Sequence, residues 1–252
     1  MDELVSVKDI SYEYGNGSDA PLKILDKVSF DAYKDEFISI IGPSGCGKST
    51  LLRIIAGLIA PNGGEITYRG KRITEPIPEI SFVFQDFALM PWLTNLENVK
   101  LGLSITRLND RQKTKRAAAL LDSFGLEGFE NSYPNVLSGG MKQRVGIARA
   151  IASNPKVLLM DEPFSSLDEL TANTLRADIL NMLKSKKISV NLVIMVTHNV
   201  EEAVELSDKI VVLSSKPTYV RSIDDIPLKY PRDKSDRGFI KIADSIYAKL
   251  TE

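Results

Sequence analysis

The sequence predicts an α/β fold with a largely parallel sheet, and three observations support this prediction. Short continuous apolar runs recur along the chain, as expected for strands that are buried on both faces. Helical patterns lie between several of these runs, and this alternation is typical of a parallel sheet. With 252 residues, 43% of them hydrophobic, the chain can bury a large core. The apolar runs lie at residues 4–7, 37–41, 157–160, 190–196 and 209–213.

Three segments carry the apolar spacing of helices. Residues 111–124 form the first, with Asp110 as the expected N-cap and Gly125 just beyond the end. Residues 141–153 and 169–184 form the other two. These helices are the helical segments that alternate with the predicted strands.

The N-terminal part has a different pattern. In residues 4–36, short β-like runs are separated by the polar loop 15–19, and the runs at 63–69 and 80–84 resemble them. Together they predict an antiparallel β layer. The stretch from about 86 to 153 has no convincing strand, so it predicts an inserted helical subdomain.

The charge balance and the hydropathy make a nucleic-acid-binding or membrane-spanning protein less expected. The 32 Lys and Arg residues oppose 33 Asp and Glu residues, so no overall field favours nucleic acid or an anionic membrane. No apolar run approaches the roughly 18 residues that span a bilayer. The acidic start, residues 1–4, lacks the layout of a signal peptide. We therefore expect a cytoplasmic protein whose membrane association requires a partner.

A glycine-rich motif follows the apolar run 37–41. Residues 42–50 read GPSGCGKST, which fits the phosphate-loop pattern G-x-x-x-x-G-K-[ST], and residues 50–57 have a helical pattern. Lys48 would lie near the β- and γ-phosphates, and Ser49 would ligate Mg²⁺. The predicted nucleotide-binding residues of this loop are Gly42, Pro43, Ser44, Gly45, Cys46, Gly47, Lys48, Ser49 and Thr50.

Cys46 is the only cysteine, which excludes an internal disulfide. A helix N-terminus can lower the pKa of a thiol, so a redox role is conceivable. The simpler interpretation is a small side chain that fits a tight turn.

A strand that ends in two acids forms the second candidate part of the site. The apolar residues 157–160 lead to Asp161 and Glu162. At the carboxyl edge of a parallel sheet such acids face the ligand crevice. Asp161 would hold Mg²⁺ through water, and Glu162 would polarise the attacking water. Solvated acids at a strand end are common, but the preceding phosphate loop and the following Pro163 and Ser166-Leu167-Asp168 favour a hydrolytic site.

Residues 137–144 read LSGGMKQR, and with the two motifs above they make the chain resemble the ATP-binding subunit of an ABC transporter. The resemblance extends from about residue 4 to about residue 215. It implies a P-loop nucleotide hydrolase core, ATP and Mg²⁺ as ligands, and ATPase activity. In this family two chains hold two ATP molecules head to tail, so a homodimer is implied. Ser138, Gly139 and Gly140 would contact a phosphate of the ATP held by the opposite subunit.

Further site residues take their roles from the same resemblance. Gln85 matches the glutamine that touches Mg²⁺ and the attacking water. His198, the only histidine, matches the switch histidine that contacts the γ-phosphate and orients the attacking water. Tyr14 resembles the aromatic residue that stacks on adenine, with Tyr12 as the alternative. Asn199 is predicted to cap the helix that follows.

The resemblance also implies the organisation of the whole chain. We expect one ABC ATPase domain over residues 1–252, with a short helix at 236–250 near its end. The family pattern assigns no role to the C-terminal extension. The predicted parts are an ATP-binding core at 1–85 and 154–215, a helical subdomain at about 86–153, and the extension at 216–252.

Two positions depart from the family pattern without removing the signature contacts. Met141 stands where glutamine is commonest, and Asp35 stands where glycine is usual. The run 141–144 instead resembles importers of the nitrate, sulfonate and taurine group, as do residues 87–94 and Pro231-Arg232-Asp233. This similarity implies ATP-powered import of a small solute through separate membrane subunits.

A hydrophobic segment follows Gln85. Its side chains can pack inside the helical subdomain, but such a strip also suits a groove for a partner helix. In the family, a cytoplasmic helix of the membrane permease docks here, between about Gln85 and Thr94. The resemblance further implies an external solute-binding protein and a peripheral location on the cytoplasmic face of the membrane. The hydrophobic residues are Phe87, Leu89, Met90, Pro91 and Trp92.

Three alternatives compete with this interpretation. A non-transport ABC ATPase acting on nucleic acid or ribosomes would carry long coiled coils or two cassettes, and this chain has neither heptads nor a second cassette, so we expect no nucleic-acid partner. A kinase or GTPase that shares only the phosphate loop would make the LSGG motif and His198 coincidences. A purely regulatory nucleotide-binding module would not need Glu162 and His198 together.

Overall fold

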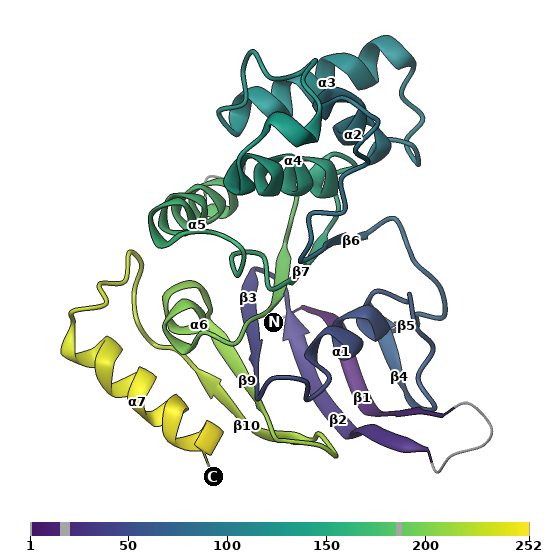
Figure 1. The fold of residues 1–252 in the computed structure, drawn as a ribbon. Coiled ribbons are helices and arrows are strands. Elements are labelled where there is room, and N and C mark those ends of the chain that lie inside the picture. The colour runs from purple at the N-terminus through teal and green to yellow at the C-terminus, as the bar shows by residue number, and fades with distance from the viewer. Residues whose placement is uncertain (1, 16–20, 185–187, 252) are drawn as a thin grey trace. The chain divides into compact units, whose positions relative to one another are not determined.

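The chain forms two compact units, each with its own set of strands and helices (Figure 1). The computed structural model describes residues 2–15, 21–184 and 188–251. Within these ranges, no helix is long and apolar enough to cross a membrane. The first unit contains residues 1–77 and 192–252, and the second unit contains residues 78–191.

Four strands of the first unit form the antiparallel β layer that the sequence predicts. Their order is β2-β1-β4-β5, and β1 pairs antiparallel with both β2 and β4. Apart from Gly15, the predicted polar loop 15–19 lies outside the described residues. The strands are β1 (Glu3–Tyr14), β2 (Leu22–Tyr33), β4 (Gly63–Tyr68) and β5 (Lys71–Arg72).

The first unit also contains parallel strands, as predicted. Strand β3 pairs parallel with β8 and with β9, and β10 pairs antiparallel with β9. Almost every residue of β3, β8 and β9 is buried, which explains their continuous apolar runs. Because β3 and β8 are parallel neighbours, their carboxyl ends meet at one edge. The strands are β3 (Glu36–Ile41), β8 (Leu192–Val196), β9 (Lys209–Leu213) and β10 (Val220–Asp225).

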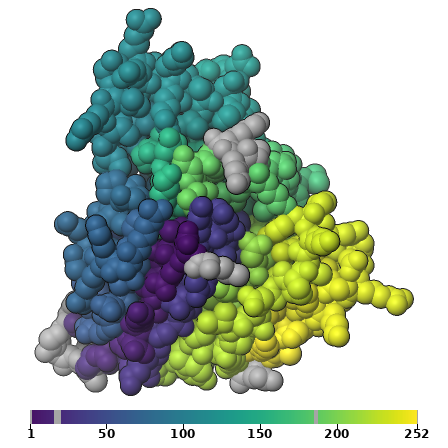
Figure 2. All heavy atoms as spheres, turned by 180° about the vertical axis from the view of Figure 1, so that it is seen from behind, coloured from purple at the N-terminus to yellow at the C-terminus, as the bar shows by residue number. Residues whose placement is uncertain are grey.

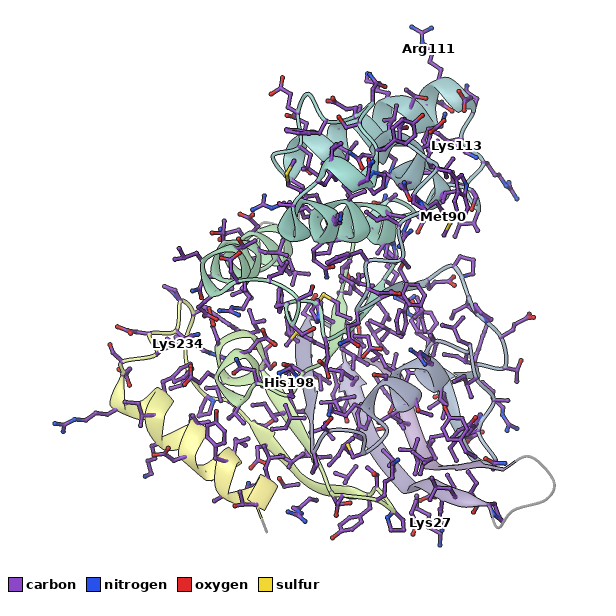
Figure 3. The ribbon with its side chains drawn as sticks, viewed as in Figure 1. Lys27, Met90, Arg111, Lys113, His198 and Lys234 are labelled. Atoms are coloured by element: carbon purple, nitrogen blue, oxygen red, sulfur yellow. The ribbon has the colours of Figure 1, made fainter. Side chains whose placement is uncertain are left out.

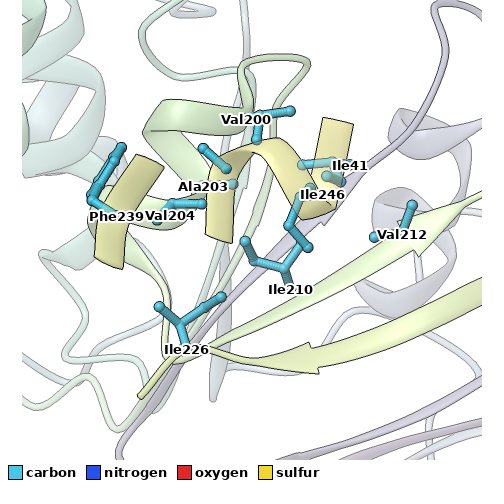
Figure 4. Packing of buried hydrophobic residues seen from close by; sticks show 10 residues of the cluster. Ile41, Val200, Ala203, Val204, Ile210, Val212, Ile226, Phe239 and Ile246 are labelled. Atoms are coloured by element: carbon cyan, nitrogen blue, oxygen red, sulfur yellow. The ribbon is translucent and has the colours of Figure 1, made fainter. Parts of the chain in front are cut away.

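Within its described residues, the first unit contains three helices. Helix α1 (Lys48–Ile55) follows β3, and α6 (Val200–Leu206) follows β8. Helix α7 (Arg237–Thr251) confirms the helix that was predicted near the C-terminus. The inner faces of α6 and α7 share a buried apolar cluster with β3 and β9 (Figure 4). This cluster consists of Ile41, Val200, Ala203, Val204, Ile210, Val212, Ile226, Phe239, Ala243 and Ile246.

The second unit contains a parallel strand pair and, in its described residues, a set of helices. Strand β6 (Ile80–Val83) pairs parallel with β7 (Val157–Asp161), so the prediction that residues 80–84 join the antiparallel layer was wrong. The pattern of a short strand does not indicate which strand it pairs with. Here the partner is β7, which contains the apolar run 157–160. The helices are α2 (Asn95–Leu101), α3 (Asp110–Ser123), the 3₁₀ turn Pro134–Val136, α4 (Gly139–Ile151) and α5 (Glu169–Lys184).

The start of α3 corrects a second prediction. Asn109, not Asp110, is the N-cap: its backbone is extended, and its side chain accepts a hydrogen bond from the Gln112 N–H (3.0 Å). The Gln112 side chain in turn accepts from the Asn109 N–H (2.9 Å), which completes a capping box. Asp110 begins the helix instead, where its charge suits the helix dipole.

Candidate nucleotide-binding site

The phosphate loop connects β3 to α1, and its glycines fit a backbone that other residues would strain. Gly45 and Gly47 have φ values of 73° and 111°, in the region that favours glycine. A Cβ atom at Gly47 would also lie 2.6 Å from Cγ2 of Ile24. The loop can therefore turn tightly in front of the helix only with glycine at this position.

Lys48 is held across the loop. Its side chain is only 5% exposed, and its Nζ donates to the carbonyls of Gly42 (2.9 Å) and Pro43 (3.0 Å). The N-cap of α1 is Gly47, and within the described chain no side chain caps this helix start and no acid lies in its first turn. Uncapped amides and the positive end of the helix dipole, next to a lysine, fit a bound phosphate group.

Thr218 supports this loop, although nothing in the sequence pattern indicates it. Its hydroxyl donates to the carbonyl of Cys46 (2.6 Å), and its backbone bonds to Ile24 and Asp26 of β2. These bonds join the N-terminal and C-terminal segments of the first unit, whose colours run from purple to blue and from green to yellow in Figure 2. The contact could not be predicted because it links residues 172 positions apart.

Cys46 is a buried filler of the loop. It is 2% exposed, and burial raises the pKa of its thiol, while the nearby Lys48 opposes that rise. The raised pKa disfavours the reactive thiolate and argues against the redox role.

We expect the Cys46 thiol to react slowly in the folded protein. Near pH 8 its reaction with a disulfide reagent should be at least about tenfold slower than in denaturant, because both access and the thiolate fraction are reduced. The rate in the folded protein should keep rising as pH increases above the ordinary thiol range. The absorbance of the released thiolate measures both rates. Equal rates with and without denaturant would contradict the buried position.

His198 lies at the same edge of the parallel strands as the phosphate loop (Figure 3). Ile40 of β3 pairs with Val196 of β8, and the Thr197 N–H donates to the Ile40 carbonyl (3.2 Å). His198 is exposed there, one residue before the helix cap. The structure thus brings together two of the predicted parts of the site.

The predicted cap of the following helix is present. The Asn199 side chain accepts from the Glu202 N–H (3.1 Å), which begins α6. Thr197 strengthens this turn: its hydroxyl donates to the Glu202 carboxylate (2.5 Å) and accepts from the Asn199 N–H (3.1 Å). The backbone on both sides of His198 is therefore held by hydrogen bonds.

Tyr14 lies at the end of β1 and is 48% exposed. Its ring meets the ring of Tyr12 edge to face, with 5.0 Å between the centroids. Burial and the neighbouring Tyr14 raise the pKa of Tyr12. Tyr14 is the more exposed of the two rings, as a surface for stacking on a base requires.

The acids of the second unit lie at the end of β7. Asp161 is the last residue of the strand and is buried, and Glu162 follows with a φ of 45°. A positive φ is uncommon for glutamate and is found where surrounding structure enforces it. Here the Glu162 carbonyl accepts from the Ser165 hydroxyl (3.0 Å), which stabilises the turn.

In the described part of the chain, no three His, Cys, Asp or Glu side chains gather as a metal site. A magnesium ion that accompanies nucleotides needs only one or two protein ligands, because phosphates and water supply the rest. Ser49, in the first turn of α1, carries a hydroxyl, and Asp161, at the end of β7, carries a carboxylate; each is an oxygen donor of the hard type that Mg²⁺ prefers.

The LSGG segment forms the start of α4, two residues earlier than predicted. Ser138 is the N-cap and accepts from the Met141 N–H (3.3 Å), and Gly139 and Gly140 form the first turn. A Cβ atom at Gly140 would lie 2.3 Å from Cγ2 of Thr171, so only glycine fits without rearrangement. Ser138 is exposed at this positive helix end, where it can meet an anion.

Gln85 is exposed and lies two residues beyond the end of β6. The next residues make a constrained turn: Phe87 and Ala88 have φ values of 63° and 45°. Arg149 of α4 holds this turn by donating to the carbonyls of Phe87 (2.8 Å) and Ala88 (2.5 Å). The segment after Gln85 is therefore tied to the helix that LSGG begins, a link that the sequence did not reveal.

The rest of this hydrophobic segment is fixed by Asn98. The buried Asn98 side chain accepts from the Met90 N–H (2.8 Å) and donates to three backbone carbonyls of residues 90–94. Phe87, Leu89 and Met90 are half-buried, whereas Trp92 is 69% exposed. Packing thus accounts for part of the strip, and Trp92 remains at the surface.

A glycine-rich loop between a parallel strand and a helix is the defining feature of P-loop nucleotide-binding proteins. The family model for ABC transporter matches residues 25–165. The aliphatic sulfonates import ATP-binding protein SsuB of Bacillus cereus is 42% identical over 238 residues, which cover 94% of this chain and 92% of that protein. An uncharacterized ABC transporter ATP-binding protein of Methanocaldococcus jannaschii is 44% identical over 220 residues, which cover 87% and 81%.

Solved structures agree with these relatives. A dimeric ATP-binding cassette in a post-hydrolysis state, bound to ADP and Pi, is 33% identical with a TM-score of 0.78 and covers 90% of this chain and 100% of its own. The chain belongs to the ABC transporter family, as an ATP-binding protein of the P-loop α/β class. It is an ATPase, with ATP and Mg²⁺ as its ligands.

Proposed function

We propose that this chain is the ATPase subunit of an importer for a small anionic solute, with aliphatic sulfonates as the favoured class. The observation that carries this proposal is the 42% identity to SsuB over almost the whole of both chains. The residue patterns at 87–94, 141–144 and 231–233 support the same group of importers.

In this proposal the first unit binds the nucleotide. Lys48 and the N-terminus of α1 hold the β- and γ-phosphates, and Tyr14 stacks on adenine. Ser49 ligates Mg²⁺, which when bound neutralises charge on the phosphate oxygens. His198 contacts the γ-phosphate and orients the attacking water. The position of His198 beside the carboxyl end of β3 supports this assignment.

The second unit supplies the remaining groups. Asp161 would help to hold the metal, and Gln85 would contact the metal and the attacking water. Glu162 accepts a proton from that water as it attacks the γ-phosphate. Ser138, with Gly139 and Gly140, contacts a phosphate of the ATP that a second copy of the chain binds. The exposed N-cap serine at the start of α4 supports this role.

The same proposal includes the partners and the location. Two copies close on two ATP molecules, as the dimeric state of the related cassette supports. Membrane permease subunits dock near residues 85–94, and an external solute-binding protein delivers the solute. The chain would then lie on the cytoplasmic face of the membrane. We further propose one ABC ATPase domain, with the core at 1–85 and 154–215, the helical subdomain at about 86–153 and the extension at 216–252.

A transport assay tests the substrate class. Cells that lack the gene should lose uptake of a labelled aliphatic sulfonate, and the wild-type gene should restore it while a Glu162→Gln variant should not. Uptake of labelled nitrate and taurine in the same cells separates the members of the group. Loss of nitrate uptake with unchanged sulfonate uptake would contradict the favoured class.

Trp92→Ala should weaken coupling to the membrane subunits while leaving ATP affinity unchanged. Trp92 is exposed, and its segment is held by Asn98, so truncation removes a surface contact and not a core residue. Truncating a hot-spot residue, a class in which tryptophan is enriched, costs about 2 kcal/mol or more, so we expect about a thirtyfold loss of affinity for the permease. Co-purification and stimulated ATPase activity measure coupling. Ile105→Ala, another exposed apolar residue of the second unit, is the control. An equal loss of ATP affinity would favour a core role.

A further inference from the structure

The C-terminal extension covers the helix that follows His198. The buried face of α7, with Phe239, Ala243 and Ile246, packs against Val200 and the other inner residues of α6 (Figure 4). Helix α6 has only seven residues and begins directly after the His198-Asn199 turn. The extension therefore packs against α6, the helix that continues directly from the His198 turn, as well as against the sheet.

Arg232 binds the C-terminal end of α6. Its Nη1 donates to the carbonyls of Val204 and Ser207, both at 2.6 Å. Its Nε donates to the Leu228 carbonyl (3.1 Å), and its guanidinium stacks on the Tyr230 ring, 4.1 Å from the centroid. The last carbonyls of a helix lack partners within the helix, and a cation there also suits the helix dipole. Arg232 thus fixes the end of α6.

Tyr230 and Lys234 reinforce the same attachment. The Tyr230 hydroxyl donates to the Leu206 carbonyl (2.6 Å) and lies 3.2 Å from the Asp208 carboxylate. The Asp208 carboxylate accepts from the Phe37 N–H at the start of β3 (2.9 Å), so the attachment reaches the strand that leads to the phosphate loop. Lys234 lies beside α6 (Figure 3), with Nζ 3.4 Å from the Glu205 carboxylate.

We propose that Tyr230, Arg232 and Lys234 form a C-terminal clamp that positions His198 through α6. The clamp holds one end of this short helix, and the Asn199 cap and the Thr197–Glu202 hydrogen bond connect the other end to the histidine. Seven helical residues span only about 10 Å, so a shift at the C-terminal end displaces the N-terminal turn. The inference rests on the proposed contact of His198 with the γ-phosphate. These residues position the histidine and do not touch the nucleotide.

The single histidine makes the proposal directly measurable. In protein labelled with ¹³C-histidine, the imidazole gives one set of NMR signals. Arg232→Ala should shift or broaden the His198 signal, and it should lower kcat of the transporter assembled with its membrane subunits by about tenfold, since small misplacements of a reacting group are costly. The KM for ATP should change by less than about twofold, because ground-state binding by the phosphate loop remains. Arg232→Lys, which keeps the charge but not the forked donors, should lie between the two proteins.

Arg237→Ala is the matched control, because Arg237 is an exposed arginine in the first turn of α7. It should leave both the His198 signal and kcat unchanged. A lowered Tm in Arg232→Ala with an unchanged His198 signal would overturn the proposal and leave a purely structural role. If Arg232→Ala does not fold, Arg232→Lys and Lys234→Ala carry the same test. His198→Ala separates the two hypotheses: full activity of that variant would refute the role of His198 in hydrolysis, whereas the His198 signal in the Arg232 variants, which keep the histidine, still reports on the clamp.

Discussion

Glu162→Gln is expected to lower kcat for ATP hydrolysis by at least about a hundredfold, because general base catalysis typically contributes 10² to 10⁴. The amide keeps the shape of the side chain but cannot accept the proton of the attacking water. Glu162 also follows β7 with a positive φ that the Ser165 hydrogen bonds support, and glutamine can keep that backbone. ATP affinity should therefore be retained. Phosphate release and nucleotide titration measure the two effects separately.

The same variant should trap the closed dimer. Light scattering should show a monomer without nucleotide and a dimer only with Mg·ATP, because the step that reopens the site is blocked. Adding Ser138→Arg, which places a bulky side chain at the start of α4, should abolish this dimer. Glu127→Gln, at an exposed acid of the second unit, should behave like wild type. A Glu162→Gln protein that binds ATP and stays monomeric would contradict closure by the chain alone.

The local elements of the fold could be predicted from the sequence because each has a local cause. Strands β3, β7 and β9 are continuous apolar runs since both faces are buried, and α5 was predicted with the bounds that the structure has. The pairing partners of the strands could not be predicted in this way. Nothing within residues 80–84 distinguishes a parallel neighbour from an antiparallel one, so the position of β6 was wrong.

In the candidate site, too, local motifs could be predicted and contacts between distant segments could not. The phosphate loop and the LSGG motif were evident in the sequence because a few adjacent residues define each of them. The bonds that hold these pieces in place join distant segments: Thr218 to Cys46, and Arg149 to Phe87. Periodicity and motif spacing do not record such pairs, because Thr218 and Arg149 look like ordinary polar residues in their own surroundings and their acceptors are backbone carbonyls. The clamp residue Arg232 is a third example.

Lys48→Met should weaken ATP binding by more than about a hundredfold. Methionine has nearly the length and volume of lysine, so the buried position stays filled while the charge is removed. Loss of one partner of a buried charged contact typically costs about 2–5 kcal/mol, and about 3 kcal/mol corresponds to this factor. The contacts of Lys48 with the Gly42 and Pro43 carbonyls would also be lost, which leaves the loop less well fixed in front of α1.

Calorimetric titration with Mg·ATP measures the change in affinity, and thermal unfolding shows whether the variant keeps its fold. Lys71→Met removes an exposed lysine of the first unit and controls for the general loss of one positive charge. It should bind ATP as the wild type does. If Lys48→Met also keeps its affinity, the loop must hold the phosphates through its amides and the helix dipole alone. In that case the ammonium, which the Gly42 and Pro43 carbonyls already bind, would serve to shape the loop and not to bind the nucleotide.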